Sequence, residues 1–411
     1  MSFFIDDGKN HRNSWCGTQV GGFTVIQTAC HNTRTVSSNY ANVVNSRRFI
    51  RFFTTLSIAI VALSAVTWFG LGRLSAAIPK LDVFSGLTDR PKKESSAINY
   101  LIVGSDTREG LTKEEVKRLR VGSASKVQGK RSDTMLLVHI SKQRDNAVII
   151  SIPRDTFALI PEHTNSAGKT VPAVHSKLNS AYSWGGAPLL IQTIEDLSGL
   201  RIDHYVEINF AGFVRMVDAL GGIDICTKKD ISDPKSHLEL PAGNHTLDGV
   251  DALKYVRSRD FDGLGDLGRM KRQQQFVGAV MRKATSAEVL LNPVKLVDFI
   301  NSSLTSISVD SGLSQSDLVN LAQELRGLST NKVRTLTIPL KYYNYSSNGV
   351  TASVLWDPVL APELFNRMKK DLPLVETVQA DPSASPTTVD NFNTGTAADN
   401  PCSGSQGSSS G

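Results

Sequence analysis

The stretch Asn99-Tyr-Leu-Ile-Val-Gly-Ser-Asp106-Thr-Arg108 is a short apolar run that ends in glycine and passes at once to an acid and an arginine. Two further apolar runs, Met135–Ile140 and Ala147–Ile152, are rich in branched residues. Continuous apolar strands of this kind indicate a sheet that is covered on both faces. Apolar residues at helical spacing in segments 189–198 and 211–220 predict helices as covering layers, the first of which ends at Gly199. Asp248 could cap a further helix that runs to Tyr255, and segments 293–304 and 314–325 are also predicted to be helical. The sequence therefore predicts an α/β fold.

Charged residues gather in five short clusters, each of which lies where a strand or helix is predicted to begin or end. A guanidinium fork matches phosphate oxygens two at a time and stays charged at any working pH. Acids beside such groups are suitable ligands for a hard cation such as Mg²⁺, although a single acid near a strand end is commonly only a turn former. The clusters are Gly104–Arg108, Arg131–Thr134, Pro153–Asp155, Tyr255–Arg259 and Gly265–Gln273.

The position of these clusters along the chain suggests that several of them converge. Asp106 and Arg154 each follow a predicted strand, and ligands of open α/β sheets bind outside the carboxyl ends of strands. Asp133 comes just before a strand, and the sequence does not show how it would reach the same place. Lys177 could add a phosphate contact, and His204 could be a base or a structural histidine.

The two later clusters place polar side chains at regular spacing. Arg257 and Arg259 point to the same side if the chain leaves the preceding helix as an extended segment. Arg269 and Gln273 lie four residues apart, on one face of a helix that Asp266 could cap. The alternative interpretation of each cluster is a solvated basic edge or an ordinary glycine-rich turn. No Gly-x-Ser-x-Gly, Walker A or Rossmann motif is present.

Residues 52–72 contain no charged side chain, which is the length of a helix that crosses a bilayer. Arg47, Arg48 and Arg51 precede this run and favour a cytoplasmic amino terminus. A buried helix and a cleaved signal peptide are the alternatives. The four cysteines lack CxxC spacing, so no zinc site is indicated, and Cys226 and Cys402 could pair on the oxidising side. The net charge of +6 does not indicate nucleic-acid binding.

The ordered clusters over about 180 residues resemble the LytR-CpsA-Psr family of cell-envelope proteins, with further matching segments at Lys177–Tyr182, Ile202–Tyr205, Val217–Gly222 and Leu247–Gly249. The resemblance implies a mixed central β-sheet sandwiched by helices, behind one N-terminal transmembrane helix. It implies a phosphotransferase that attaches a glycopolymer from a polyprenyl-pyrophosphate carrier to peptidoglycan through a phosphodiester bond. The partners would be that lipid-linked glycan, the peptidoglycan acceptor and the membrane, with no nucleic acid.

The same resemblance implies a role for each residue of the clusters. Asp106 and Asp133 would hold Mg²⁺, the expected cofactor. A pyrophosphate-binding group would comprise Arg131, Arg154, Arg257, Arg259, Arg269 and Gln273. Catalytic roles would fall to Arg154, Asp266 and Arg269, with Asp266 as a base or an orienting acid. The alternatives are a lipid pyrophosphatase, in which water replaces the acceptor, a lipid-binding scaffold, and a non-catalytic envelope regulator of the transcriptional-attenuator type.

These features predict a single-pass cell-membrane protein whose catalytic domain lies outside the cytoplasm. They divide the chain into six predicted parts. They are a cytoplasmic segment (1–51), a transmembrane helix (52–72), a linker (73–97), the extracytoplasmic catalytic domain (98–341), a C-terminal extension that packs on or follows it (342–380) and a disordered tail (381–411).

Overall fold

The computed structural model describes residues 78–120, 132–165, 167–259, 265–290, 299, 302–303, 306–314, 316–317, 320–321, 328–374, 395–398 and 402. The predicted transmembrane segment, residues 52–72, lies outside them. Among the helices of the described residues, none is both long and apolar enough to cross a membrane.

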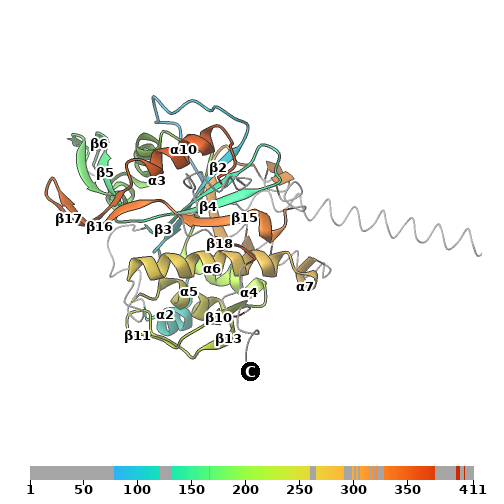
Figure 1. Cartoon of the computed structure of the whole chain (residues 1–411). Coiled ribbons are helices and arrows are strands. Elements are labelled where there is room, and N and C mark those ends of the chain that lie inside the picture. Colours follow the sequence, from blue (N-terminus) through green and yellow to red (C-terminus); the bar gives the residue numbers. More distant parts are fainter. Residues whose placement is uncertain are drawn as a thin grey trace, which may run out of the picture. The chain divides into compact units, whose positions relative to one another are not determined.

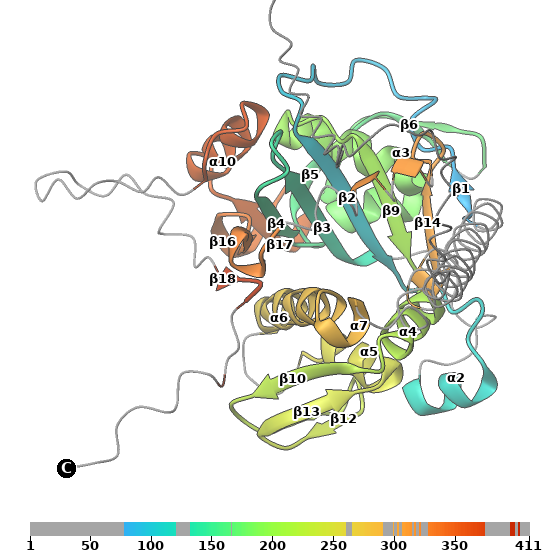
Figure 2. The ribbon, with the colours of Figure 1, turned by 90° about the vertical axis from the view of Figure 1, so that its right-hand side faces the viewer.

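A mixed sheet of eight strands forms the centre of the fold, in the order β1-β14-β9-β2-β3-β4-β15-β18 (Figure 2). β2 pairs antiparallel with β3 and parallel with β9, while β4 pairs antiparallel with β3 and parallel with β15. The predicted mixed α/β sheet is therefore confirmed. Its strands are β1 (Lys80–Leu81), β2 (Ile98–Ser105), β3 (Ser132–Ile140), β4 (Ala147–Ile152), β9 (His204–Ile208), β14 (Ile307–Asp310), β15 (Val333–Thr337) and β18 (Gly395–Thr396).

Both faces of the sheet are covered, as the continuous apolar runs predict. All six residues of β4 are buried. On β3 the neighbours Leu136 and Leu137 point to opposite faces and belong to different hydrophobic clusters. β1 shows that the predicted linker already contributes to the sheet from Lys80 onward.

Helices α3 (Leu178–Ser198) and α10 (Leu360–Lys369) cover one face of the sheet (Figure 1). Their apolar side chains join those of the strands in one large buried cluster. α3 is interrupted at Gly186, which has a φ of 66° just before Pro188, and it ends at the predicted stop, Gly199. The sequence pattern predicts only its second half, because the interruption breaks the helical periodicity.

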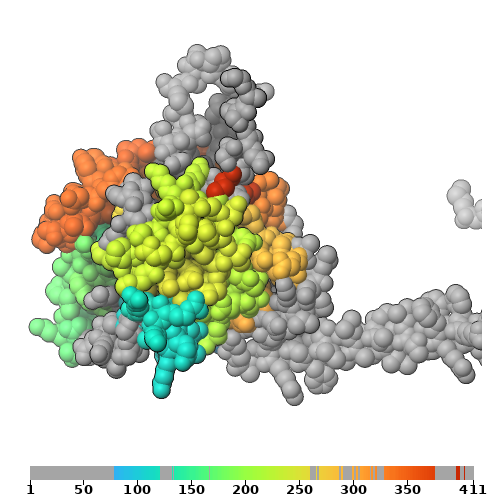
Figure 3. Space-filling model, turned by 90° about the horizontal axis from the view of Figure 1, so that it is seen from below, coloured from blue at the N-terminus to red at the C-terminus, as the bar shows by residue number. Residues whose placement is uncertain are grey.

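Helices α4, α5 and α6 cover the opposite face, and two small hairpins lie beyond them (Figures 1 and 2). Seen from below, the segments that carry these hairpins form much of the surface that faces the viewer (Figure 3). α4 and α5 approach so closely that a side chain at Gly249 would collide with the backbone of Val214. The bounds are α4 (Phe210–Ala219), α5 (Gly249–Arg257) and α6 (Asp266–Ala284), with hairpin strands β10 (Ile223–Thr227), β13 (Gly243–Leu247), β11 (Ile231–Asp233) and β12 (Leu238–Leu240).

Three further strand pairs and three short helices are found in the described part of the chain. The first two pairs are nested, since β6 and β7 lie between β5 and β8, and the third pair carries two exposed tyrosines. The pairs are β5 (Phe157–Ile160) with β8 (Val174–Lys177), β6 (His163–Thr164) with β7 (Thr170–Val171), and β16 (Leu340–Ser347) with β17 (Val350–Trp356); the short helices are α2 (Lys113–Leu119), α7 (Ala287–Leu290) and η3 (Thr330–Lys332).

The C-terminal segment that carries β18 and Cys402 contacts α6 and β10, which together we call the α6 and β10 lobe. β18 adds to the edge of the sheet beside β15, within the tail that the sequence predicts to be disordered. Arg282 on α6 donates a hydrogen bond to the carbonyl of Ala397. Cys402 then forms a disulfide with Cys226 on β10, so the pairing suggested by the sequence is confirmed.

Two local predictions can be compared directly with the structure. Asp248 caps α5, since its side chain accepts a hydrogen bond from the backbone of Asp251, as predicted. Asp266 does not cap α6. The N-cap is Gly265, whose φ of 54° and ψ of −123° suit glycine, and Asp266 is the first helical residue. The predicted helices 293–304 and 314–325 lie mostly outside the described residues.

Candidate active site

Three of the five clusters meet at one edge of the sheet because of strand direction. Asp106 follows β2 and Arg154 follows β4, both at carboxyl ends. β3 lies between these strands and runs antiparallel to both, so its amino end, which carries Asp133, lies at the same edge. The route by which Asp133 reaches the site, which the sequence leaves open, is thus the antiparallel pairing of β3.

A β-bulge sets the backbone of Asp133 apart from the regular ladder. Gly104 pairs with Thr134 and Ser105 pairs with Ser132, which leaves Asp133 as an extra residue on β3, inside the strand and not before it. Asp106 is half-buried one residue beyond the end of β2. The backbone therefore brings the two proposed carboxylates to adjoining strands, which fits a shared hard cation.

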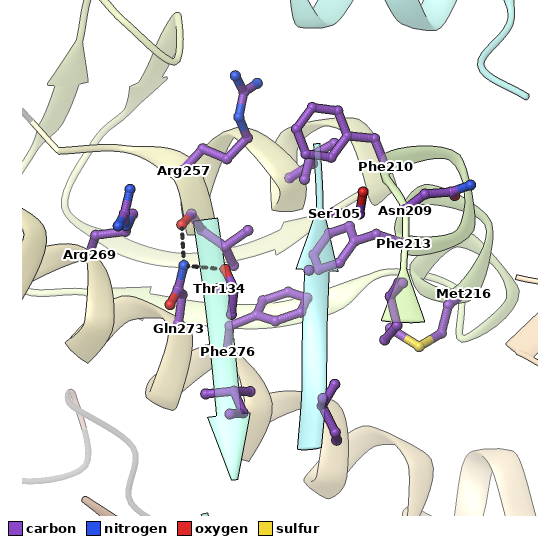
Figure 4. A pocket seen from close by; sticks show the side chains of 16 residues that line it. Ser105, Thr134, Asn209, Phe210, Phe213, Met216, Arg257, Arg269, Gln273 and Phe276 are labelled. Carbon is purple, nitrogen blue, oxygen red and sulfur yellow. Dashed lines mark hydrogen bonds between the residues drawn. The ribbon is translucent and has the colours of Figure 1, made fainter. Parts of the chain in front are cut away.

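An apolar cavity of about 140 Å³ lies between the sheet and helices α4, α5 and α6 (Figure 4). Its walls carry the rings of Phe210, Phe213 and Phe276 together with aliphatic side chains. Three polar side chains, Arg257, Arg269 and Gln273, lie together at one side of it (Figure 4). The other lining residues are Ile102, Gly104, Ser105, Thr134, Leu136, Ile208, Asn209, Met216, Leu253 and Val256.

The polar side chains at the cavity are held by contacts from three elements. The Gln273 amide nitrogen donates to Thr134 Oγ1 on β3 at 2.8 Å and to the Val256 carbonyl on α5 at 3.3 Å. The guanidinium carbon of Arg257 lies 4.9 Å from the centre of the Phe210 ring. Arg269 is 3% exposed. One side of the cavity is thus cationic and amide-lined, and it adjoins an aromatic interior.

Helix α6 presents its site residues on one face, as the four-residue spacing of Arg269 and Gln273 predicts. Phe276 follows three residues later and lines the same cavity. The helix begins at Asp266, directly after the positive φ of Gly265. The aromatic residue of this face was missed because its role depends on elements far away in the sequence.

Arg154 belongs to a loop that is tied to the start of α3. Its Nε lies 3.4 Å from Asp155 Oδ2, and Lys177 Nζ lies 3.4 Å from Asp155 Oδ1. The Arg154 carbonyl accepts the backbone N–H of Asn179 at 3.0 Å, and Thr156 accepts that of Leu178 at 2.8 Å. The loop therefore supplies the acceptors that the first turn of α3 lacks.

Arg259 is placed differently from Arg257. The chain is extended at Ser258, as the two-residue spacing requires, but of the two arginines only Arg257 lines the cavity. The backbone N–H of Arg259 donates to Asp233 Oδ2 at 2.5 Å. Burial alone would raise the pKa of Asp233, and backbone donors from Arg259, Lys235 and Ser236 outweigh it and lower that pKa.

Some of the remaining predicted residues lie outside the described part of the chain, and others lie away from the cavity. Arg131 lies outside the described residues, and so do the side chains of Asp133 and Asp266. Asp106 and Arg154 lie at the same sheet edge without lining the described cavity. His204 bonds Asp310 through Nδ1 at 3.2 Å and stacks on Tyr100, which favours its structural interpretation.

A buried tyrosine pair on the α3 side of the sheet was not predicted. Tyr205 Oη donates to Glu207 Oε2 at 3.0 Å, and Tyr182 of α3 lies against the same group. Burial, followed by the Glu207 charge, raises the pKa of both tyrosines well above the ordinary value. Tyr205 and Glu207 lie two residues apart on β9 and therefore on the same face of the strand. That spacing is the sequence signal that could have predicted their contact.

Comparison with known proteins identifies the chain. The LytR_cpsA_psr family model matches residues 79–370. "Probable cell wall biosynthesis protein LcpB" of Corynebacterium glutamicum is 35% identical over 67% of this chain, which spans 62% of LcpB. "Polyisoprenyl-teichoic acid–peptidoglycan teichoic acid transferase TagU" of Oceanobacillus iheyensis is 30% identical over 68% of this chain and 76% of its own length. The crystal structure of gbs0355 from Streptococcus agalactiae superposes with a TM-score of 0.54 and 25% identity, over 68% of this chain and 91% of that one. The chain therefore belongs to the LytR_cpsA_psr family.

Proposed function

We propose that this protein transfers a glycopolymer from a polyprenyl-pyrophosphate carrier to cell-wall peptidoglycan and leaves the two joined by a phosphodiester. One observation carries the proposal: an aromatic cavity with Arg257, Arg269 and Gln273 grouped at one side of it. An isoprenoid chain suits the phenylalanine-lined interior, and its phosphates suit guanidinium forks. The similarity to TagU, a polyisoprenyl-teichoic acid–peptidoglycan teichoic acid transferase, supports the same chemistry.

The proposed reaction is a displacement at the phosphorus next to the glycan. An acceptor sugar hydroxyl attacks that phosphorus, its oxygen forms the new P–O bond, and the bond to the second phosphate breaks. Polyprenyl monophosphate leaves with the bonding electron pair, and the hydroxyl proton is lost to a base. We assign the orienting and charge-stabilising roles to Arg154 and Arg269 and the base or orienting role to Asp266.

Arg257 and Arg259 form a proposed clamp, in which both guanidinium forks position the pyrophosphate. Arg257 approaches the phosphates from the cavity, and Arg259 approaches from beyond the extended Ser258. Arg131 would complete the group from the segment that precedes β3. Because positioning supplies most of the rate in phosphoryl transfer, a fork that holds two oxygens contributes more than charge alone.

A magnesium ion is the proposed cofactor. Asp106 and Asp133 would hold it, as their adjoining places at the ends of β2 and β3 allow. Mg²⁺ supplies neutralisation of the pyrophosphate charge when bound. Asp133→Ala is expected to abolish Mg²⁺-dependent turnover while the melting temperature stays within a few degrees of wild type. Unchanged rate and metal dependence in that variant would overturn the assignment.

We place the catalytic domain outside the cytoplasm, anchored by residues 52–72. The Cys226–Cys402 disulfide supports this location, because such bonds persist in oxidising compartments. A reporter enzyme that works only outside the cytoplasm should be active when it is fused after Leu340, and a reporter that works only inside should be inactive there. An active cytoplasmic reporter at that position would reject the membrane topology.

The decisive experiment supplies the purified full-length protein with a synthetic polyprenyl-pyrophosphate glycan, with and without peptidoglycan. Glycan joined to peptidoglycan, together with polyprenyl monophosphate, is the expected product. Release of the monophosphate at the same rate without acceptor, and no joined product, would instead identify a lipid pyrophosphatase. Binding of the lipid with no product of either kind would identify a scaffold.

Arginine-to-lysine variants test the clamp in the same assay. Arg257→Lys and Arg259→Lys should each lower transfer by about tenfold or more, a loss of about 1.4 kcal/mol in transition-state binding. Arg215→Lys is the matched control, since that arginine lies exposed on α4 away from the cavity lining. Wild-type rates in both clamp variants would eliminate the clamp.

A further inference from the structure

The β16–β17 hairpin carries an aromatic surface that the proposed chemistry has not used. Tyr342 is 49% exposed, although tyrosine usually hides most of its ring. Figure 1 shows this hairpin beside β5 and β6, away from the helices α4, α5 and α6 that enclose the cavity. The surface is therefore distinct from the proposed lipid site.

Four rings on two hairpins form a continuous series, which we call the aromatic ladder: Tyr342, Tyr345, Phe157 and His175. Tyr342 stacks on Tyr345 at 6.3 Å, Tyr345 meets Phe157 edge-on at 5.2 Å, and Phe157 stacks on His175 at 5.0 Å. Register shifts in β16 bring Tyr342 and Tyr345 together despite their odd spacing.

Polar groups accompany the ladder along its length. Lys341 Nζ lies 5.4 Å from the Tyr342 ring, and the Asn348 amide lies 3.3 Å from His175 Nδ1. Rings with polar groups at their edges are suited to a ligand that has both apolar faces and hydrogen-bonding rims.

The ladder is joined to the catalytic loop by direct contacts. The Val354 N–H of β17 donates to the Asp155 carbonyl at 2.8 Å, and Trp356 Nε1 donates to Thr156 Oγ1 at 3.0 Å. Phe157 pairs with Lys177 in the β5–β8 register, and Lys177 is the residue that contacts the Asp155 carboxylate. The hairpin that carries the ladder and the Arg154 loop are thus held together as one unit, with Phe157 of the ladder two residues after Asp155.

We propose that the aromatic ladder binds the acceptor, a glycan strand of N-acetylated hexoses, and directs it to the Arg154 loop. The C–H groups on the face of a sugar ring carry partial positive charge and meet the electron-rich face of Tyr342 or Tyr345. Ring hydroxyls and amides face the polar groups beside the ladder. The inference rests on the proposed function for the acceptor's identity, and it gives the acceptor a path separate from that of the lipid.

The test measures binding without turnover. Soluble, uncrosslinked peptidoglycan glycan strands are titrated into the full-length protein, and the dissociation constant is compared between variants. Tyr342→Ala and Tyr345→Ala should each weaken binding by about tenfold, the effect of losing an aromatic anchor. Tyr343→Ala is the matched control, because it is adjacent and more exposed, and no ring among the described residues stacks on it. Its affinity should equal that of wild type.

Each outcome either supports or overturns the ladder. Equal affinity in all three variants overturns it, and so does weakened binding to phospholipid vesicles with unchanged binding to glycan, which would assign the surface to the membrane. In the transfer assay the two ladder variants should raise the KM for peptidoglycan and leave binding of the donor lipid unchanged. Loss of glycan binding in a protein that shows no transfer would support the ladder and reject the proposed transferase reaction, so the two failures are distinguishable.

Discussion

The two faces of the central sheet are covered in different ways. On one face, α3 and α10 fill the space with buried aliphatic and aromatic side chains such as Leu190, Ile194 and Phe365. On the other face, α4, α5 and α6 leave a cavity of about 140 Å³ against β2 and β3. The first face stabilises the sheet, whereas the second retains room for a ligand next to its arginines.

The contrast teaches that stability and binding are divided between faces of the same strands. Leu137 is fully buried on the packed face, and its neighbour Leu136 lines the cavity. Because successive residues of a strand alternate between faces, one strand serves both purposes without compromise between them.

The largest expected effect comes from truncating this pair. Leu137→Ala should lower the free energy of unfolding by about 2–5 kcal/mol, because it opens a cavity in a filled core. Leu136→Ala should cost about 1–2 kcal/mol, because part of its surroundings is already empty. Urea denaturation of both variants measures the difference. Equal losses would show that the two faces are packed alike.

Removal of the disulfide should loosen only the cavity side. Cys402→Ser is expected to cost about 2–4 kcal/mol, because the bond closes a long loop. Hydrogen exchange should accelerate in α6 and β10 and stay unchanged in α3, which has no covalent tie to this segment. Acceleration in both helices would contradict the division between faces.

A pH-dependent effect should follow from the charge on Asp233, which supports Arg259 beside the cavity. Asp233→Asn is expected to lower stability at pH 7 by about 1–3 kcal/mol. The folded-state pKa of Asp233 lies below its unfolded value, so its stabilisation is present above about pH 4 and is lost as the pH falls through the folded pKa. Melting temperatures of wild type and variant should therefore converge below about pH 4. A difference between the two melting temperatures that stays constant from about pH 7 to about pH 3 would contradict this role of the Asp233 charge.

The smallest expected effect concerns Gln273, which connects α6 to β3 and α5 at the side of the cavity. Gln273→Leu removes the hydrogen bonds to Thr134 and Val256 and should cost about 0.5–1.5 kcal/mol. Affinity for a short-chain polyprenyl pyrophosphate should fall more than stability does, since the amide lies among the proposed phosphate ligands. Unchanged affinity would remove Gln273 from the binding group.

The sequence allowed the strands β3 and β4 to be predicted because both are long apolar runs, and the cap at Asp248 because its side chain acts locally. It could not show that Phe210 and Phe276 share a cavity, because these two residues lie on different helices and are 66 residues apart in the chain. The true cap of α6 was missed because a positive φ at Gly265 leaves no side-chain signature.

The site was likewise predictable only in part. Spacing was enough to place Arg269 and Gln273 on one helical face. Spacing was not enough to predict that Arg257 lines the cavity and Arg259 does not. The position of Arg259 depends on its backbone bond to Asp233, which lies on the β11–β12 hairpin. The aromatic ladder needs two hairpins and a register shift, neither of which has a local pattern strong enough to read.

The Cys226–Cys402 bond also has a consequence for biosynthesis. The two cysteines are 176 residues apart, and every strand of the central sheet except β18 precedes residue 338. A nascent chain can therefore assemble the sheet apart from β18, together with α4, α5 and α6, before residue 402 has been translated. Closure of the α6 and β10 lobe is then a late step, after the other layers have formed. Pulse-labelled chains trapped with a thiol-blocking reagent should contain a folded sheet whose Cys226 is still free.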